Sequence, residues 1–236
     1  MSEQMNTPML PPPSGISEWF SVWRDAVTKP SEQTFSRIAL SPNAKLTTAF
    51  LWVFLGSLVS AFLSSLVQGQ VMRQMMQSYG MEGLPQTTGN TLIAAICGAP
   101  VAALISVLLF ALVTGIIQVL AKMFGGRGTF EQLAYAFAAI TTPFSLISGV
   151  LALLSAIPWV GACFGIVGLL AGLYVVVLEV MAVKGVNQFG WGQAIGSFFL
   201  PVLVLCCCLS VGVFAILQAL GPTISDTFET ILTPMP

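Results

Sequence analysis

One acidic residue lies inside a long apolar segment, and it is the best candidate for chemistry within a membrane. Glu179 continues a stripe of small residues, from Gly161 through Gly165 and Gly168 to Gly172, at helical spacings of three and four. This spacing predicts that Glu179 points inward from a helix. A charged side chain at the centre of a bilayer costs about 2.5 to 3.5 kcal/mol. The carboxyl group should therefore lie near the end of its helix, be protonated or have a partner.

Further polar residues are expected at the same end of the helices as Glu179, namely Lys122, Arg127, Tyr135 and Lys184. Two interpretations of this group remain open. In the first, Glu179 is a carboxylate that binds a proton or an ion. In the second, it forms an ion pair that ties its helix to the loop containing Arg127. We favour the ion pair, because a transport path usually needs further polar groups deeper in the bundle.

The chain has no recognisable catalytic, cofactor or metal-binding motif. It contains no histidine, and its five cysteines lie in or beside apolar segments without the spacing of metal ligands. The glycines around Arg127 match neither common phosphate-binding motif, so we interpret this segment as a turn before a helix. Thr129 and Gln132 then form a predicted capping box for that helix. We expect a protein that is not an enzyme and that uses no cofactor.

The elements that carry these residues are predicted to be transmembrane helices. Charged residues make up 7% of the chain, far below the roughly 25% of soluble domains. No charged residue occurs between Glu131 and Glu179, a segment long enough for two spans of roughly 20 residues each. We predict an all-α integral membrane protein with five transmembrane helices, at about 46–67, 100–121, 132–156, 160–183 and 194–217. The second span is expected to begin at a break or kink at Pro100.

The third and fourth spans are predicted to form a close-packed hairpin. Small side chains let membrane helices approach each other, because lipid offers no hydrophobic contrast that would drive their association. The residues expected in this contact are Gly161, Gly165, Gly168 and Gly172 on the fourth span and Ala138, Ser145 and Ala152 on the third.

The N-terminal region is predicted to form a collar at the membrane surface. Residues 1–15 are expected to be a disordered tail, residues 16–43 an amphipathic collar with a short interfacial helix, residues 44–220 the membrane domain and residues 221–236 a short tail. Four aromatic residues are assigned to the membrane interface: Trp19, Phe20, Trp23 and Phe35. The collar either only packs on the bundle, which we favour, or also docks a partner protein.

Three short patterns resemble the Yip domain family, polytopic proteins that interact with Ypt/Rab proteins, together with their prokaryotic relatives. They are Trp23 followed by Pro30 and Thr34-Phe35, the glycine segment 125–128 followed by Phe130 and Gln132, and Thr142-Pro143. The resemblance extends over about residues 23–220. It implies a non-enzymatic scaffold or adaptor in membrane organisation or trafficking. The alternative is a small transporter or channel subunit that uses Glu179.

The distribution of basic residues predicts the orientation in the membrane. With five spans, every Lys and Arg except Arg73 lies on the side of the N-terminus. The positive-inside rule then places the N-terminus in the cytoplasm and the C-terminus outside. We expect a prokaryotic plasma membrane protein whose partners are the lipid bilayer and a protein at the cytoplasmic face. Nucleic acid is not expected at a net charge of -1, and a homo-oligomer is left open.

Overall fold

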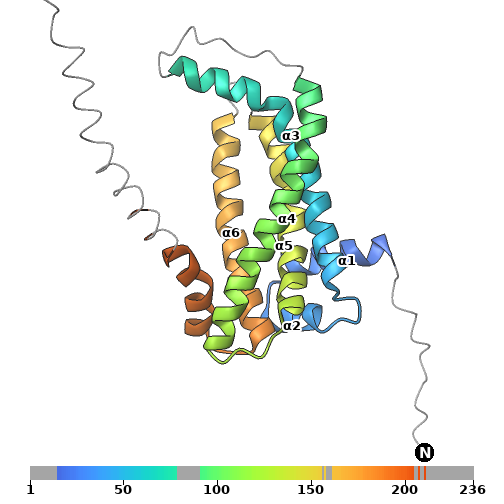
Figure 1. Ribbon diagram of the computed structural model, residues 1–236, viewed down its shortest axis with the longest axis vertical. Coiled ribbons are helices and arrows are strands. Elements are labelled where there is room, and N and C mark those ends of the chain that lie inside the picture. The colour runs from blue at the N-terminus through green and yellow to red at the C-terminus, as the bar shows by residue number, and fades with distance from the viewer. Residues whose placement is uncertain are drawn as a thin grey trace, which may run out of the picture.

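The computed structural model describes residues 15–78, 91–155, 157, 161–204, 207 and 210, and within these residues the chain is helical with no strand. The labelled helices in Figure 1 are α1 (Ile16–Thr28), α2 (Glu32–Ala39), α3 (Leu46–Ser78), α4 (Thr91–Met123), α5 (Phe130–Ser155) and α6 (Gly161–Asn187). A further apolar helix covers Trp191–Val204. Helices α4, α5 and α6 and the first part of α3 run along the long axis of the bundle, and the last part of α3 runs across one end of it. Helices α1 and α2 are short and lie toward the opposite end. We call this end, which also contains the loop between α4 and α5, the collar end.

Four helices in the described part of the chain are long and apolar enough to cross a membrane. They cover Leu46–Gln68, Ala95–Met123, Phe130–Ser155 and Cys163–Asn187. The α-helical membrane class is therefore confirmed. Of the predicted fifth span, 194–217, the structure describes a continuous helix only to Val204, so five spans remain a prediction. The expected tails at residues 1–14 and 221–236 also lie outside the described residues.

Pro100 does not break the second span. Helix α4 begins at Thr91 and continues through Pro100 to Met123, so the predicted break at the proline, and with it a span that begins there, is wrong. The alternative of a kink at Pro100 stays a prediction. A proline removes one backbone hydrogen bond and strains the preceding turn. Transmembrane helices tolerate it because neighbouring groups and small local adjustments satisfy the freed carbonyl.

Small residues bring α3 and α5 close together. A Cβ atom on Gly56 of α3 would lie 2.5 Å from Ser145 Oγ of α5. A Cβ atom on Gly149 of α5 would lie 2.9 Å from the Cα atom of Ser60 of α3. The hydroxyl groups of Ser60 and Ser148 also meet across this contact at 3.5 Å. The serine face of α5 therefore packs on α3.

The predicted close contact between the glycines of α6 and the small face of α5 is wrong. Cβ atoms added to Gly165, Gly168 and Gly172 would meet no heavy atom within 4 Å. Instead, the two helices leave an apolar groove of about 290 Å³, lined by Ser145 and Leu151 on one side and Gly168 and Gly172 on the other. Small residues permit close approach but do not select the partner, and α3 takes the face of α5 that α6 was expected to use. Of the other predicted contact residues, Gly161 packs against the carbonyl group of Ser155 at the hairpin turn, Ala138 is fully buried in the core and Ala152 is half-buried.

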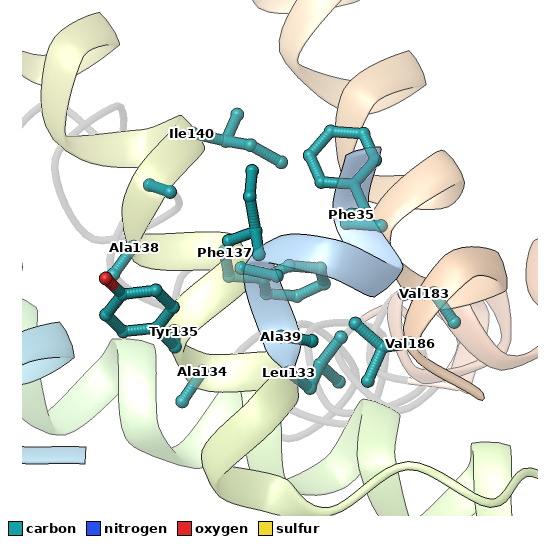
Figure 2. Close-up of a cluster of buried hydrophobic side chains, with 14 of the residues drawn as sticks. Phe35, Ala39, Leu133, Ala134, Tyr135, Phe137, Ala138, Ile140, Val183 and Val186 are labelled. Carbon is teal, nitrogen blue, oxygen red and sulfur yellow. The ribbon is translucent and has the colours of Figure 1, made fainter. Parts of the chain in front are cut away.

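The buried core lies at the collar end of the bundle. Most of its members come from the first turns of α5 and the last turns of α6, together with α2 and the start of α3, and α1, α4 and the helix Trp191–Val204 contribute one or two each. Figure 2 shows α2 with Phe35 lying between α5, which carries Leu133 and Ile140, and α6, which carries Val183. Phe35 is completely buried. The collar is thus part of the core of the protein.

Candidate functional site

Aromatic side chains attach α1 to the bundle. The rings of Trp19 and Trp23 pack edge-on against Trp52 of α3, with centroid distances of 5.8 and 5.6 Å. Trp52 in turn lies 4.9 Å from Tyr135 of α5, and both are buried. Of the four residues assigned to the membrane interface, only Phe20 is largely exposed, at 60%.

The assignment of Phe35 to the membrane interface is therefore wrong. The spacing of apolar residues in α2 shows that one face must be covered, but it does not distinguish lipid from protein as the cover. In this fold the cover is protein, because α5 and α6 enclose the Phe35 ring. Trp19 and Trp23 are half-buried and share their apolar surface with the bundle.

A close approach and an ion pair hold α2 against α6. A Cβ atom on Gly185 would lie only 2.7 Å from the carbonyl oxygen of Glu32, so this contact requires glycine. The Glu32 carboxylate accepts a hydrogen bond from Lys184 Nζ, which also lies 4.3 Å from the centroid of the Trp191 ring. The side chain of Lys184 is 11% exposed, whereas that of Glu32 is 49% exposed. The partner of Lys184 is thus a residue of the collar.

Two buried amides fix the glycine loop between α4 and α5. Gln118 Nε2 donates hydrogen bonds to the Gly128 carbonyl at 2.6 Å and to Asn187 Oδ1 at 3.1 Å. The Asn187 carbonyl accepts from the Arg127 backbone N–H at 3.1 Å. Cβ atoms on Gly126 and Gly128 would lie 2.6 and 2.9 Å from Asn187 Oδ1, so both positions require glycine. The loop is therefore a packed turn, and its glycines let the backbone lie directly against the Asn187 side chain.

Sequence reasoning missed Gln118 and Asn187. Both are polar residues within a turn or two of the end of a long apolar helix, and both are almost fully buried. Buried amides need hydrogen-bond partners. A polar residue near the end of a long apolar helix was therefore the signal that could have identified them. The predicted capping box beside them is present, with the Thr129 N–H donating to Gln132 Oε1 at 3.0 Å and the Gln132 N–H donating to Thr129 Oγ1 at 3.3 Å.

The polar residues expected around Glu179 do not form one site. Lys184 pairs with Glu32, Tyr135 packs on Trp52, and Lys122 and Arg127 are exposed. Within the described residues, no hydrogen bond or ion pair reaches the Glu179 carboxylate, so the predicted ion pair between Glu179 and the loop that contains Arg127 is wrong. Five residues along a helix turn a side chain by about 140°, which places Glu179 and Lys184 on different faces of α6.

Two adjacent depressions form a groove on the outer surface of the collar end. The larger has a volume of about 690 Å³ and the smaller about 120 Å³. They share Ser36, Leu40 and Gln188, and we call the combined feature the collar groove. Gln188 ends α6 with a positive φ of 55°, a geometry common at helix C-termini.

The chemistry of the collar groove is an apolar centre between basic groups. Leu40, between the two depressions, is 64% exposed. Arg37 lines the larger depression with a side chain that is 68% exposed and contacts Asp25 at 3.3 Å. Arg127 lines the smaller depression and is exposed. Such an arrangement suits an apolar side chain next to acidic groups.

A comparison with models of protein families tests the resemblance to the Yip domain family that the sequence patterns indicated. The model of the Yip1 domain matches residues 24–212. The chain belongs to the Yip1 domain family. No curated protein and no solved structure gives a significant match. The matched region includes α2, the glycine loop and the four long helices, so the collar groove and Glu179 both belong to the family domain of this chain.

Proposed function

We propose that this protein is a non-enzymatic scaffold or adaptor that binds a partner protein at the cytoplasmic face of a membrane. Its role would lie in membrane organisation or trafficking. The observation that carries the proposal is the collar groove, in which exposed Leu40 lies between Arg37 and Arg127. Arginine is enriched among the residues that dominate binding at protein interfaces, and here two arginines line the groove around an exposed apolar side chain.

The basic residues support a cytoplasmic position of the collar end. Arg24, Lys29, Arg37 and Lys45 lie in or beside α1, α2 and the start of α3, and Lys122, Arg127 and Lys184 lie at the same end of the bundle. The positive-inside rule places such an end in the cytoplasm, and we propose a prokaryotic plasma membrane as its location. A reporter fused after Pro236 should therefore be extracytoplasmic, and a cytoplasmic reporter would contradict the proposed five-span orientation.

The charge and shape of the groove define the partner. Lys184 is neutralised by Glu32 at the floor of the larger depression, whereas Arg127 has no ion pair within the described residues. Arg37 is already paired with Asp25, so the partner should present an apolar side chain next to an Asp or Glu that pairs with Arg127. Charged groups of this kind contribute mainly to specificity and to the rate of association.

The test compares one arginine variant and one lysine variant at the same end of the protein. Arg127→Glu reverses a charge inside the collar groove, and Lys122→Glu reverses an exposed charge that lies outside it. Proteins that copurify from native membranes in mild detergent are quantified for each variant and for Leu40→Asp. We expect the partner to be lost with Leu40→Asp and Arg127→Glu and retained with Lys122→Glu. Equal recovery from all three would overturn the proposal.

The alternative of a transporter or channel subunit rests on the unpaired carboxylate of Glu179. It is less supported, because Thr114 is the only other polar residue among the described residues that line the pocket around Glu179. A conducting path generally requires a series of polar groups. Flux of a radiolabelled ion into liposomes that disappears in Glu179→Gln would support this alternative over the adaptor.

A further inference from the structure

A second pocket lies on the side of the bundle, away from the collar groove. It has a volume of about 320 Å³ and lies between α4, α5, α6 and the helix Trp191–Val204. We call it the acid pocket, after Glu179. Its other defining residues are Thr114, Phe110, Phe137 and Phe198.

Two polar groups in the acid pocket lack partners. The Glu179 carboxylate makes no hydrogen bond or ion pair within the part of the chain that the structure describes. The Oγ1 atom of Thr114 is buried and has no hydrogen-bond partner, and the residue is only 1% exposed. Unsatisfied groups of this kind in an apolar site call for a ligand or another partner. The nearest basic residue on α6, Lys184, is already engaged by Glu32 and Trp191.

The outer edge of the acid pocket is apolar and faces away from the protein. Leu109, Val113 and Val202 line it and are 55%, 47% and 57% exposed. They belong to helices that are apolar over this region, and α4 and α6 are long enough to cross the membrane. Access to Glu179 from this side therefore leads through the hydrocarbon part of the membrane, and a ligand must be soluble in lipid.

The composition of the pocket favours an organic cation over a metal ion. Calcium binds six to eight oxygen ligands and magnesium six, but among the described residues that line this pocket only Glu179 and Thr114 offer side-chain oxygen atoms. An ammonium group donates up to three hydrogen bonds and is also attracted to aromatic faces. The carboxylate, the threonine and three phenylalanine rings supply both kinds of contact.

We propose that the acid pocket binds the ammonium group of a lipid-soluble amine, with Glu179 and Thr114 as hydrogen-bonding partners and the phenylalanine rings around it. The amine is either a free alkylamine or the head group of an aminophospholipid. Its apolar chain extends into the bilayer past Leu109 and Val202. This site is separate from the collar groove, and its test is independent of partner binding.

The experiment measures protection of Glu179 from a hydrophobic carbodiimide. Dicyclohexylcarbodiimide adds to a protonated carboxyl group to give an O-acylisourea, which rearranges to a stable N-acylurea or reacts with an amine to give an amide and dicyclohexylurea. Peptide mass spectrometry detects the N-acylurea and the amide, and their sum measures the modification of Glu179. The full chain is placed in phosphatidylglycerol nanodiscs at mildly acidic pH, alone or with dodecylamine, dodecanol or phosphatidylethanolamine. We expect modification of Glu179 without additive, protection by dodecylamine and no protection by dodecanol. Glu179→Gln identifies the modified residue.

The outcomes separate the two sources of the amine. Protection by both dodecylamine and phosphatidylethanolamine supports an aminophospholipid, and protection by dodecylamine alone supports a free amine. Equal protection by dodecanol, protection by neither amine, or absence of carbodiimide modification at Glu179 would each overturn the proposal.

A pair of neighbouring phenylalanines supplies a matched control. Phe198 lines the acid pocket, whereas Phe199 is 45% exposed and does not line it. Phe198→Leu should raise the dodecylamine concentration for half protection about threefold, the size of one cation–π contact. Phe199→Leu should leave it unchanged. Equal behaviour of the two variants would exclude the acid pocket as the place where the amine binds.

Discussion

Replacing Gln118 by alanine should destabilise the fold more than any other single change to a polar side chain of α4. Gln118 is 3% exposed, and its Nε2 atom donates to Gly128 and to Asn187. The variant leaves the Gly128 carbonyl and the Asn187 Oδ1 atom without this donor. One unsatisfied buried group costs about 1 to 3 kcal/mol, so we expect a loss of about 2 to 6 kcal/mol for the two groups.

Thermal unfolding of the protein in detergent, followed by tryptophan fluorescence, measures this loss. For a chain of this length, each kcal/mol lowers Tm by about 2 to 4 °C, so Gln118→Ala should lower it by about 4 to 24 °C. Ser106→Ala is the matched control on the same helix, because the Ser106 hydroxyl is exposed and bonds only to the Ala102 carbonyl. It should change stability by less than about 0.5 kcal/mol.

A double variant tests whether the two amides act as a pair. Gln118 and Asn187 are partners of each other, so Asn187→Ala combined with Gln118→Ala should cost clearly less than the sum of the two single losses. The reasoning is refuted if the two losses add, or if Gln118→Ala lowers Tm no more than Ser106→Ala does. Either result would mean that the amides do not fix the glycine loop.

Three further predictions use the same purified protein. Gly128→Ala should cost about 1 to 3 kcal/mol, because its Cβ atom would lie 2.7 Å from Val186 Cγ1. Gly168→Ala, with no atom within 4 Å of the added Cβ, should not lower Tm and should raise it slightly, because alanine favours the helix more than glycine does. Lys184→Met should release α2, seen as faster hydrogen exchange at residues 32–39, and unchanged exchange would show that the ion pair is dispensable. With native cysteines replaced, the pair Ser60→Cys and Ser148→Cys should cross-link efficiently. Cysteine pairs across the groove between α5 and α6 should not cross-link. The reverse result would support the contact between α5 and α6 that the sequence predicted.

The class of the protein could be predicted from its sequence because class depends on composition and segment length. Few charged residues and apolar segments of about 20 residues are properties of the chain alone. The predicted spans 46–67 and 132–156 differ by only a few residues from Leu46–Gln68 and Phe130–Ser155. The capping box of Thr129 and Gln132 was also predictable, because its two residues are three positions apart.

The candidate sites depended on contacts between distant segments. Glu32 and Lys184 are 152 positions apart, and no local pattern pairs them. Glu179 was assigned to the glycine stripe of α6, yet it lines a pocket with α4 and the helix Trp191–Val204. The collar groove requires α2, the glycine loop and the end of α6 together.

The sequence by itself determined that the chain is an α-helical membrane protein, where most of its helices lie and how one of them is capped. Only the tertiary structure decided that α5 packs its small face on α3, that Phe35 belongs to the core and that Glu179 has no ion-pair partner within the described residues. The reason is physical. In a bilayer, lipid chains and neighbouring helices are equally apolar, so hydrophobic patterning shows which face is apolar but not what covers it.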